Sequence, residues 1–177
     1  LSYPSRFMLA AALNPCPCGY YTDPRHECSC SPNQIQRYMS RISGPLLDRI
    51  DIHVEVPALT HDELTQKQGG DTSDDMRSTV VKAREVQLQR YRGEDRMFCN
   101  AHMESRHIRD HCKLDAPSAT LLKRAIDQLG LSARAYDRIL KVSRTIADLD
   151  GSETIQSSHI AEAIQYRSLD RKLWMGG

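Results

Sequence analysis

The sequence is poor in large aromatic residues and carries almost no net charge. Its 177 residues include two Phe and one Trp, and 24 basic residues stand against 23 acidic ones, for a net charge of +1. The few aromatic rings argue against a surface that stacks on nucleic-acid bases. The charge balance excludes a global basic field, so any contact with DNA must be local.

Long apolar runs are also missing. No stretch approaches the roughly 20 consecutive apolar residues that span a bilayer, so no membrane partner is expected. The first residues, Leu1-Ser2-Tyr3-Pro4, contain no initiator Met and no signal-peptide pattern, and we expect a piece of a longer polypeptide. With 40% hydrophobic and 27% charged residues, the chain should be folded and soluble.

Four of the six cysteines lie in two Cys-x-Cys pairs, Cys16/Cys18 and Cys28/Cys30, with nine residues between the pairs. Four thiolates this close in sequence can surround one metal ion tetrahedrally, as zinc prefers. The alternatives are reduced thiols, disulfides formed during purification, or iron in place of zinc. Because the rest of the chain is helix-rich, a reduced cytoplasmic setting with a metal site is favoured over a secreted disulfide scaffold.

The residues around these pairs fit a metal site. Pro17 and Gly19 can help the chain make the sharp turn that a one-residue spacer requires, and His26 is a possible substitute ligand. The loop has too few apolar residues to form a core, so metal binding would supply the missing folding free energy. Cys99 and Cys112 are expected to be isolated thiols.

Two short strands are expected to frame the Cys loop. Residues 6–13 form an apolar run, although Ala10–Ala12 leave a helix possible, and residues 50–56 alternate apolar and polar side chains. A helix from Ser31-Pro32 to about Ser43 should lie between them. Apolar periodicity and end signals predict five further helices, over residues 74–91, 102–112, 115–129, 132–149 and 157–167.

The predicted fold class is therefore α/β plus α, and predominantly helical. We divide the chain into residues 1–65 with the strands and the Cys loop, residues 66–98 with a hinge and a helix, and a helical bundle over 99–177. The hinge is placed at the polar segment 66–73, which contains Gly69-Gly70.

Three polar residues stand at positions suited to nucleotide hydrolysis between subunits. Asn14 ends the first apolar run and can orient a water at a γ-phosphate. Arg49 stands just before the second expected strand and can neutralise charge on a neighbour's phosphate. Arg134 opens a helix. Each also has an ordinary interpretation: an Asn-Pro turn, an Asp48–Arg49 surface ion pair, and a solvated helix face.

Four ordered motifs resemble the magnesium-chelatase-like AAA+ ATPases, and the resemblance extends from Tyr3 to about Arg171. The motifs are Ala-Leu-Asn-Pro-Cys-Pro-Cys-Gly (12–19), Ile-Ser-Gly-Pro-Leu-Leu-Asp-Arg-Ile-Asp (42–51), Leu-Ser-Ala-Arg-Ala-Tyr (131–136) and Arg-Thr-Ile-Ala-Asp-Leu (144–149). The resemblance implies the C-terminal part of an AAA+ core followed by a helical lid. It implies that Asn14 is the sensor-1 residue, Arg49 the arginine finger and Arg134 the sensor-2 arginine.

The helix at 74–91 resembles an insertion before the lid. The resemblance implies that this insertion repositions the lid, so that Arg134, on the lid, is expected to act on a neighbour's nucleotide. The resemblance also implies ATP and Mg²⁺ as cofactors and a homo-oligomer, a hexameric ring, as the working assembly. The chain has no Gly-x-x-x-x-Gly-Lys-[Ser/Thr] loop and no apolar strand that ends in Asp-Glu. We therefore expect the phosphate-binding loop and the acidic strand end to lie upstream, in the rest of the ATPase domain, and this chain alone should not hydrolyse ATP.

The Cys loop favours the branch of the family linked to uptake of transforming DNA, which implies an ATP-dependent DNA helicase or branch-migration factor. Two alternatives stay open: a motor that inserts magnesium into a porphyrin, and a non-catalytic zinc-stabilised binding module. Basic residues on the 74–92 helix could contact DNA phosphates, but acidic residues are interspersed and a solvated helix is the simpler reading. His102, His107 and His111 are expected to form an ordinary polar face.

Overall fold

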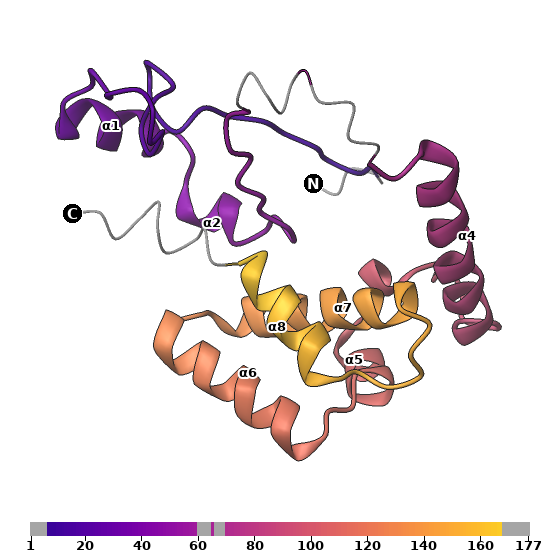
Figure 1. The fold of residues 1–177 in the computed structure, drawn as a ribbon. Coiled ribbons are helices and arrows are strands. Elements are labelled where there is room, and N and C mark those ends of the chain that lie inside the picture. Colours follow the sequence, from indigo (N-terminus) through magenta and orange to yellow (C-terminus); the bar gives the residue numbers. More distant parts are fainter. Residues whose placement is uncertain (1–6, 60–64, 66–69, 168–177) are drawn as a thin grey trace. The chain divides into compact units, whose positions relative to one another are not determined.

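The computed structural model describes residues 7–59, 65 and 70–167. The chain divides into two compact units, Leu1–Ser43 and Gly44–Gly177. We call them the Cys unit and the lid unit. The described residues are mainly helical (Figure 1), which confirms the predominantly helical part of the predicted fold class.

The Cys unit consists of an extended segment, the Cys loop and helix α1 (Pro32–Met39). The predicted start of α1 is confirmed, because Ser31 and Gln34 form a capping box and Pro32 occupies the first turn. The helix ends at Met39 and not near Ser43. At its end the Ser40 hydroxyl donates to the Arg37 carbonyl oxygen at 3.0 Å, an alternative to continued helix that serine side chains offer.

The two predicted strands are not present in the described residues. Residues 7–14 and 50–59 are irregular or extended, and the β-type contact of the described chain is an isolated bridge between Leu114 and Ile155. A strand requires a neighbour to pair its backbone N–H and C=O groups. Apolar side chains on both segments, including Met8 and Val56, are exposed. The sequence pattern is that of a strand, but among the described residues neither segment joins a β-ladder.

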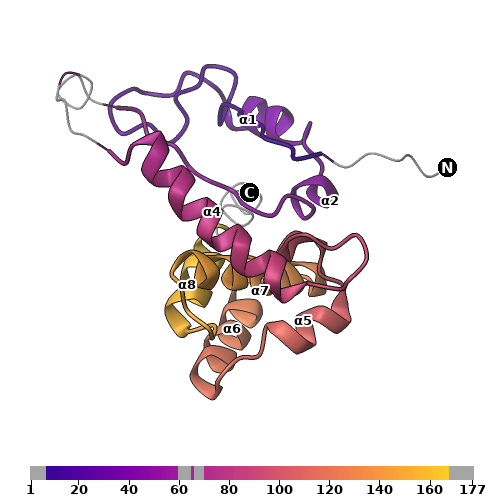
Figure 2. The same ribbon diagram turned by 90° about the vertical axis from the view of Figure 1, so that its right-hand side faces the viewer.

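The described helices of the lid unit form a bundle with α7 at its centre, in contact with α4, α5, α8 and η1, while α6 packs on α8 (Figure 2). None of the described helices is long and apolar enough to cross a membrane. The elements are α2 (Gly44–Leu47), α4 (Ser73–Arg90), η1 (Asn100–His102), α5 (Ser105–His111), α6 (Ala116–Leu129), α7 (Ala133–Leu149) and α8 (Ser157–Gln165). The five helices predicted after residue 73 are thus confirmed, whereas α2 was not predicted.

Local sequence signals set the ends of the central helices. The Asp115 carboxylate accepts from the Ser118 amide at 2.9 Å at the start of α6, and the Ser132 hydroxyl accepts from the Ala135 amide at 3.1 Å at the start of α7. Gly130 ends α6 in the left-handed conformation, with φ of 62°. Between these ends, Leu122, Ile139 and Ile160 are fully buried in one core.

Only the second half of α4 packs against the rest of the lid unit. Ala83, Gln87 and Tyr91 are buried, whereas Met76 and Val80 of the first half are exposed. In the sequence, the apolar residues Met76, Val80, Ala83 and Tyr91 recur at helical spacing and form one face. That face extends beyond the region that α7 covers. The first half of α4 therefore stays in solvent in this chain.

A buried charge network fixes this second half. The Asp148 carboxylate of α7 accepts two hydrogen bonds from the Arg90 guanidinium, at 2.7 and 2.5 Å, and one from Arg144 at 3.1 Å. The Asn100 side-chain amide donates to the same carboxylate at 2.8 Å. Because Asp148 is fully buried and every oxygen is satisfied, the network ties α4, η1 and α7 into one piece.

Candidate metal centre and arginine sites

The four paired cysteines converge in the Cys unit. Their sulfur atoms all lie within 4.8 Å of one another, with Sγ–Sγ distances of 3.3 Å for Cys16–Cys18, 3.7 Å for Cys16–Cys28 and 3.5 Å for Cys18–Cys28. Four sulfurs at about 2.3 Å from a tetrahedral zinc ion would be about 3.8 Å apart. The set therefore has the donor chemistry and nearly the spacing of a zinc site, and it is the metal-ligating group found in the described residues.

The backbone of the loop is folded to bring the sulfurs together. The Gly19 amide donates to the Cys16 carbonyl oxygen at 3.1 Å, and the Tyr21 amide donates to the Cys16 sulfur at 3.4 Å. Gly19 has a φ of 87°, a conformation that favours glycine. This is the sharp turn that the one-residue spacer requires, and it leaves Cys16 fully buried beneath the loop.

The thiols do not share a common acidity. The Tyr20 backbone amide, assisted by the neighbouring thiols, lowers the pKa of Cys18 to about 5 even though burial opposes the shift. The pKa of Cys28 is raised to about 12: the Cys30 amide lowers it, but burial and hydrogen bonds with Cys18 and Cys16 outweigh that effect. Negative charge thus settles first on Cys18, and a bound dication is what would allow further thiolates to form.

Other candidate ligands lie elsewhere. His26 stacks on Tyr20 and faces Asp23, with Nδ1 3.3 Å from the carboxylate, so it is not part of the sulfur cluster. Cys99 and Cys112 are free thiols, as expected, and Cys112 is buried.

The three histidines of the lid unit have structural contacts. His107 Nδ1 accepts from the Glu104 amide at 3.0 Å, and His102 Nδ1 accepts from the Phe98 amide at 3.3 Å. The His111 ring packs edge-on against Tyr91. Among the described residues, no group of metal-ligating side chains forms around them. The prediction of an ordinary polar face does not hold for His107, which is 4% exposed.

Arg49 follows α2 and is exposed. Among the described residues its guanidinium has one hydrogen-bond partner, the Pro45 carbonyl oxygen at 2.7 Å. Arg134, in the first turn of α7, is 71% exposed and lies 4.0 Å from the Asp48 carboxylate. Asp48 precedes Arg49 directly in the sequence, and both predicted arginines of the lid unit are exposed to solvent.

Asn14 lies in the Cys unit, at the end of the extended segment and beside the Cys loop. Its amide nitrogen is 4.0 Å from the position that a Cβ atom would take on Gly19. The side chain is exposed and has no hydrogen-bond partner among the described residues. Asn14 is therefore adjacent to the Cys cluster and available to an outside ligand.

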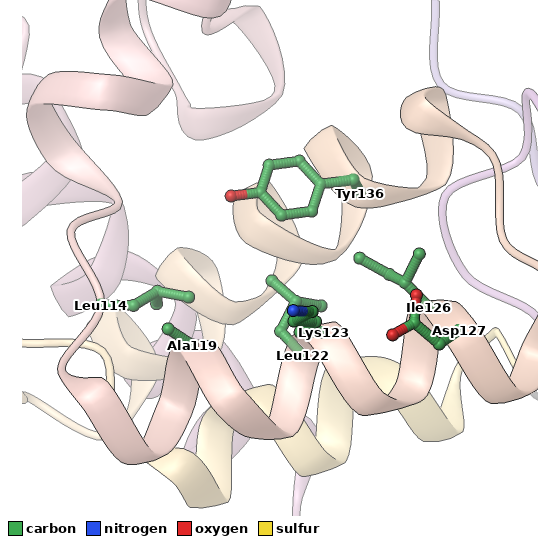
Figure 3. A pocket seen from close by; sticks show the side chains of 7 residues that line it. All are labelled: Leu114, Ala119, Leu122, Lys123, Ile126, Asp127 and Tyr136. Atoms are coloured by element: carbon green, nitrogen blue, oxygen red, sulfur yellow. The ribbon is translucent and has the colours of Figure 1, made fainter.

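A shallow hollow lies on the lid between α6 and the start of α7. Figure 3 shows the Tyr136 ring facing α6 across it, opposite Leu122 and Ile126, with Lys123 and Asp127 on the same helix. Tyr136 is 40% exposed because it borders this hollow. The volume, about 250 Å³, is below the range of about 300–1,000 Å³ typical of ligand pockets. We assign no ligand to it.

The sequence did not single out several residues that surround Arg49. Ser132, Arg138 and Arg167 all contact the segment from Asp48 to Asp51. Arg138 lies one turn after Arg134 on the same stripe of α7, and that spacing was the available signal. Arg167, at the end of α8, carried none, because its contact is 117 residues away in sequence.

Comparison with known proteins places this arrangement in a family. The family model described as "Magnesium chelatase, subunit ChlI C-terminal" matches residues 70–167, and the model "Magnesium chelatase, subunit ChlI" matches residues 1–64. The chain belongs to the magnesium-chelatase-like family, as its motifs predicted. The two matches meet within residues 64–70, in the region expected to hold the hinge.

Individual relatives narrow the assignment. The chain is 47% identical to the competence protein ComM of Haemophilus influenzae over 98% of its own length and 33% of that protein. It is 41% identical to the uncharacterized protein YifB of Escherichia coli over 98% of the chain and 33% of the relative. An uncharacterized Mycobacterium tuberculosis protein is 35% identical over 93% of the chain and 32% of the relative. The chain thus spans about a third of the length of these relatives.

Proposed function

We propose that this chain is the C-terminal part of the ATPase module of a ring-forming AAA+ motor. In the complete protein it supplies an arginine that acts on the nucleotide of the adjoining subunit. Membership of the magnesium-chelatase-like family and the likeness to ComM support this reading. The remaining two thirds of such a protein would carry the phosphate-binding loop and the residues that hold Mg²⁺.

One observation carries the proposal: Arg49 is exposed on the lid unit, and it directly follows Asp48, whose carboxylate lies 4.0 Å from the exposed Arg134. An arginine finger has to reach outward from its own subunit, and an exposed side chain meets that requirement. Arg49 holds only the carbonyl oxygen of Pro45 among the described residues, a neutral partner that a phosphate oxygen can replace. An exposed guanidinium group suits the negative charge that develops on a transferring γ-phosphoryl group.

The other predicted site residues receive roles in the same scheme. Asn14, exposed beside the Cys loop, would orient the attacking water. Arg134, in the first turn of α7, would sense the nucleotide through the angle of the lid, from a lid repositioned by α4. The domain boundaries predicted above, at residues 65 and 98, would then separate the core, the hinge with α4, and the lid.

The extended segments 7–14 and 50–59 fit this scheme. Their exposed apolar residues, such as Phe7, Met8, Val54 and Val56, form surfaces that a folded protein normally covers. We propose that both segments become strands of an AAA+ core when the rest of the domain pairs with them. The partial α/β core predicted from sequence is thus a property of the complete protein.

We further propose that Cys16, Cys18, Cys28 and Cys30 bind one Zn²⁺ ion. The convergence of four sulfurs at nearly tetrahedral spacing supports zinc, and the protein would act in the cytoplasm, where thiols stay reduced. The ion would stiffen the loop beside Asn14. A zinc-stabilised binding module without catalysis is the competing function that this cluster favours.

For the work of the motor, the likeness to a protein named for competence leads us to propose an ATP-dependent DNA helicase or branch-migration factor. The rival is a motor that inserts magnesium into a porphyrin. Stimulation of ATP hydrolysis by forked or duplex DNA separates the two, since a metal-inserting motor has no reason to respond to DNA.

A subunit-mixing experiment on the complete protein tests the role of Arg49. One variant carries Arg49→Ala, and a second carries an alanine in place of the lysine of its phosphate-binding loop. Each should be nearly inactive alone. Mixed rings should regain hydrolysis, because intact nucleotide sites of the first variant then meet intact arginines of the second.

Two results would contradict the proposal. Full activity of Arg49→Ala alone would make the arginine structural and favour the binding-module reading. Inactive mixed rings, with co-assembly shown by sedimentation, would mean that Arg49 serves its own subunit. Arg41→Ala, which changes an exposed arginine of the Cys unit, is the matched control and should leave hydrolysis unchanged.

A further inference from the structure

Residues 48–53, the segment that carries Arg49, are contacted by side chains at the start of α7 and just after the end of α8. The Arg138 guanidinium of α7 donates to the Arg49 carbonyl oxygen at 2.5 Å and also to the Asp51 carboxylate. The Ser132 hydroxyl, at the start of α7, donates to the Asp48 carboxylate at 3.0 Å. The first turns of α7 thus contact the residues before and after Arg49 as well as its own backbone.

The residues just after α8 contact the same segment. Arg167 is 1% exposed, donates to the Ile50 carbonyl oxygen and lies 3.7 Å from the Asp48 carboxylate. The His53 amide donates to the Tyr166 carbonyl oxygen at 2.9 Å. The backbone carbonyl groups of Arg49 and Ile50 are therefore each bonded to an arginine from the helical part of the lid unit, while Arg49 itself remains exposed.

From these contacts we infer that Arg138 and Arg167 are positioning residues for Arg49, and that they join the arginine finger to the lid of its own subunit. The inference rests on the proposed function of Arg49. A rotation of α7 and α8 moves the backbone of residues 48–53 with it, and so moves the Arg49 guanidinium relative to the neighbour's phosphate. Arg134 shares α7 and Asp48 with this brace, so both arginines shift together.

The charges explain why arginine is suited to these two positions. Asp48 and Asp51 would repel a phosphate if they were left unpaired beside Arg49. Arg138 and Arg167 neutralise them and still have N–H groups left for the backbone carbonyls, which a lysine point charge satisfies less completely. Arg138 is 23% exposed and Asp51 is 59% exposed, so this half of the brace can be altered without opening the core.

The test uses the complete protein and the Arg138→Gln variant. Displacement of a catalytic group by about 1 Å can cost up to a hundredfold in rate, and we expect kcat for ATP hydrolysis to fall roughly tenfold. KM for ATP should stay the same, because the neighbour's phosphate-binding loop holds the nucleotide. Arg138→Lys should recover part of kcat. Arg124→Gln, an exposed arginine of α6 removed from the brace, is the control and should have no effect.

A double-mutant cycle separates positioning from an independent effect. If Arg138 acts through Arg49, Arg138→Gln should cause no further loss of kcat in an Arg49→Ala background, measured with radiolabelled ATP. Equal loss in both backgrounds would overturn the inference. So would an unchanged kcat in Arg138→Gln when Arg49→Ala is inactive. Full activity of Arg49→Ala would instead reject the proposed function, so the two failures differ.

Hydrogen exchange gives a readout that does not depend on hydrolysis. Arg138→Gln should speed amide exchange at residues 50–53 severalfold and leave the buried parts of α7 and α8 protected. Unchanged exchange at 50–53 would overturn the inference, because the brace would then hold nothing. The Asp51→Asn variant, altered on the exposed side, should give a smaller change in the same direction. It keeps the test valid if Arg138→Gln loosens the lid.

Discussion

The two compact units solve the same folding problem with different means. The lid unit buries a continuous core of twelve residues, among them Leu122, Ile139 and Ile160. In the described part of the Cys unit, the buried apolar residues are Cys16 and Met39. Apolar burial contributes about 25 cal/mol per Å², so the lid can be stable by packing alone, whereas the Cys unit requires another source of free energy. A metal ion at the four sulfurs would be that source.

Metal removal should separate the units most strongly. Structural zinc sites contribute roughly 10–16 kcal/mol of apparent binding free energy, which becomes folding free energy when the apo site is not formed. We expect a strong chelator, or the Cys28→Ser/Cys30→Ser variant, to unfold residues 16–31 and to leave the lid helices intact. Hydrogen exchange of both regions and zinc content by atomic emission provide the measurement. A Cys99→Ser variant is the control.

Unchanged hydrogen exchange in residues 16–31 after complete metal loss would contradict this expectation, since the loop would then be stable without a metal. Faster exchange in the lid helices after metal loss would also contradict it, since the lid unit would then depend on the metal. Either result would remove the distinction between a unit that depends on a metal and one that depends on a core.

The second prediction concerns the buried charge network of the lid. Asp148→Asn leaves Arg90 and Arg144 with a neutral partner in a buried site, and removing one member of such a network costs about 3–5 kcal/mol. We expect the thermal unfolding midpoint of the lid to fall accordingly, with zinc content unchanged. Asp137→Asn, a half-buried carboxylate on the same helix without a described ion pair, is the control.

The same carboxylate gives the lid an acid dependence. Burial alone would raise the pKa of Asp148, but hydrogen bonds from Arg90 and Asn100 and the charges of Arg90 and Arg144 hold it below its ordinary 3.8. A lowered pKa means that this stabilisation is complete above the unfolded pKa of about 3.9 and is lost as the pH falls through the folded value. Lid stability should therefore drop below about pH 4, and Asp148→Asn should flatten that part of the profile.

The sequence predicted the helices of the lid unit better than the two strands expected at residues 6–13 and 50–56, for a physical reason. Helices α6 and α7 carry their end signals locally, in Asp115, Gly130 and Ser132, and their hydrogen bonds lie within the helix. A strand has no such independence. Residues 7–14 and 50–59 have strand patterns but join no β-ladder among the described residues, so the pattern alone could not predict their state.

The candidate sites divide in a similar way. The spacing of Cys16, Cys18, Cys28 and Cys30 was enough to predict that their sulfurs meet, because all four lie in one short loop. The contacts of Arg138 and Arg167 with residues 49–51 join positions 89 and 117 residues apart. Such contacts depend on how helices pack, and a single sequence shows neither their register nor their direction. The roles of Asn14, Arg49 and Arg134 stay predictions.

A cavity in the lid core should have a smaller effect that stays local. Leu122 is 1% exposed, and truncation of a buried leucine to alanine typically costs about 3 kcal/mol. We expect Leu122→Ala to lower the unfolding midpoint of the lid without changing zinc affinity. The exposed Leu88 of α4 offers a matched Leu→Ala control with little expected cost. Zinc loss in Leu122→Ala would show that the two units are thermodynamically coupled.

Removal of one helix cap from each unit is the mildest test, and it asks how each unit absorbs the same small loss. Asp115→Ala removes the acceptor for the Ser118 amide, and Ser31→Ala removes the acceptor for the Gln34 amide at the start of α1. Each loss costs about 1 kcal/mol, roughly a factor of five in an equilibrium constant. The lid unit should show the loss as a slightly lower unfolding midpoint.

The Cys unit should show the loss in its zinc affinity. Helix α1 begins two residues after Cys30, and metal binding and folding are one equilibrium there. Ser31→Ala should therefore weaken zinc affinity by about fivefold. Competition with a chromogenic chelator measures this value. Unchanged affinity would mean that α1 forms independently of the metal loop.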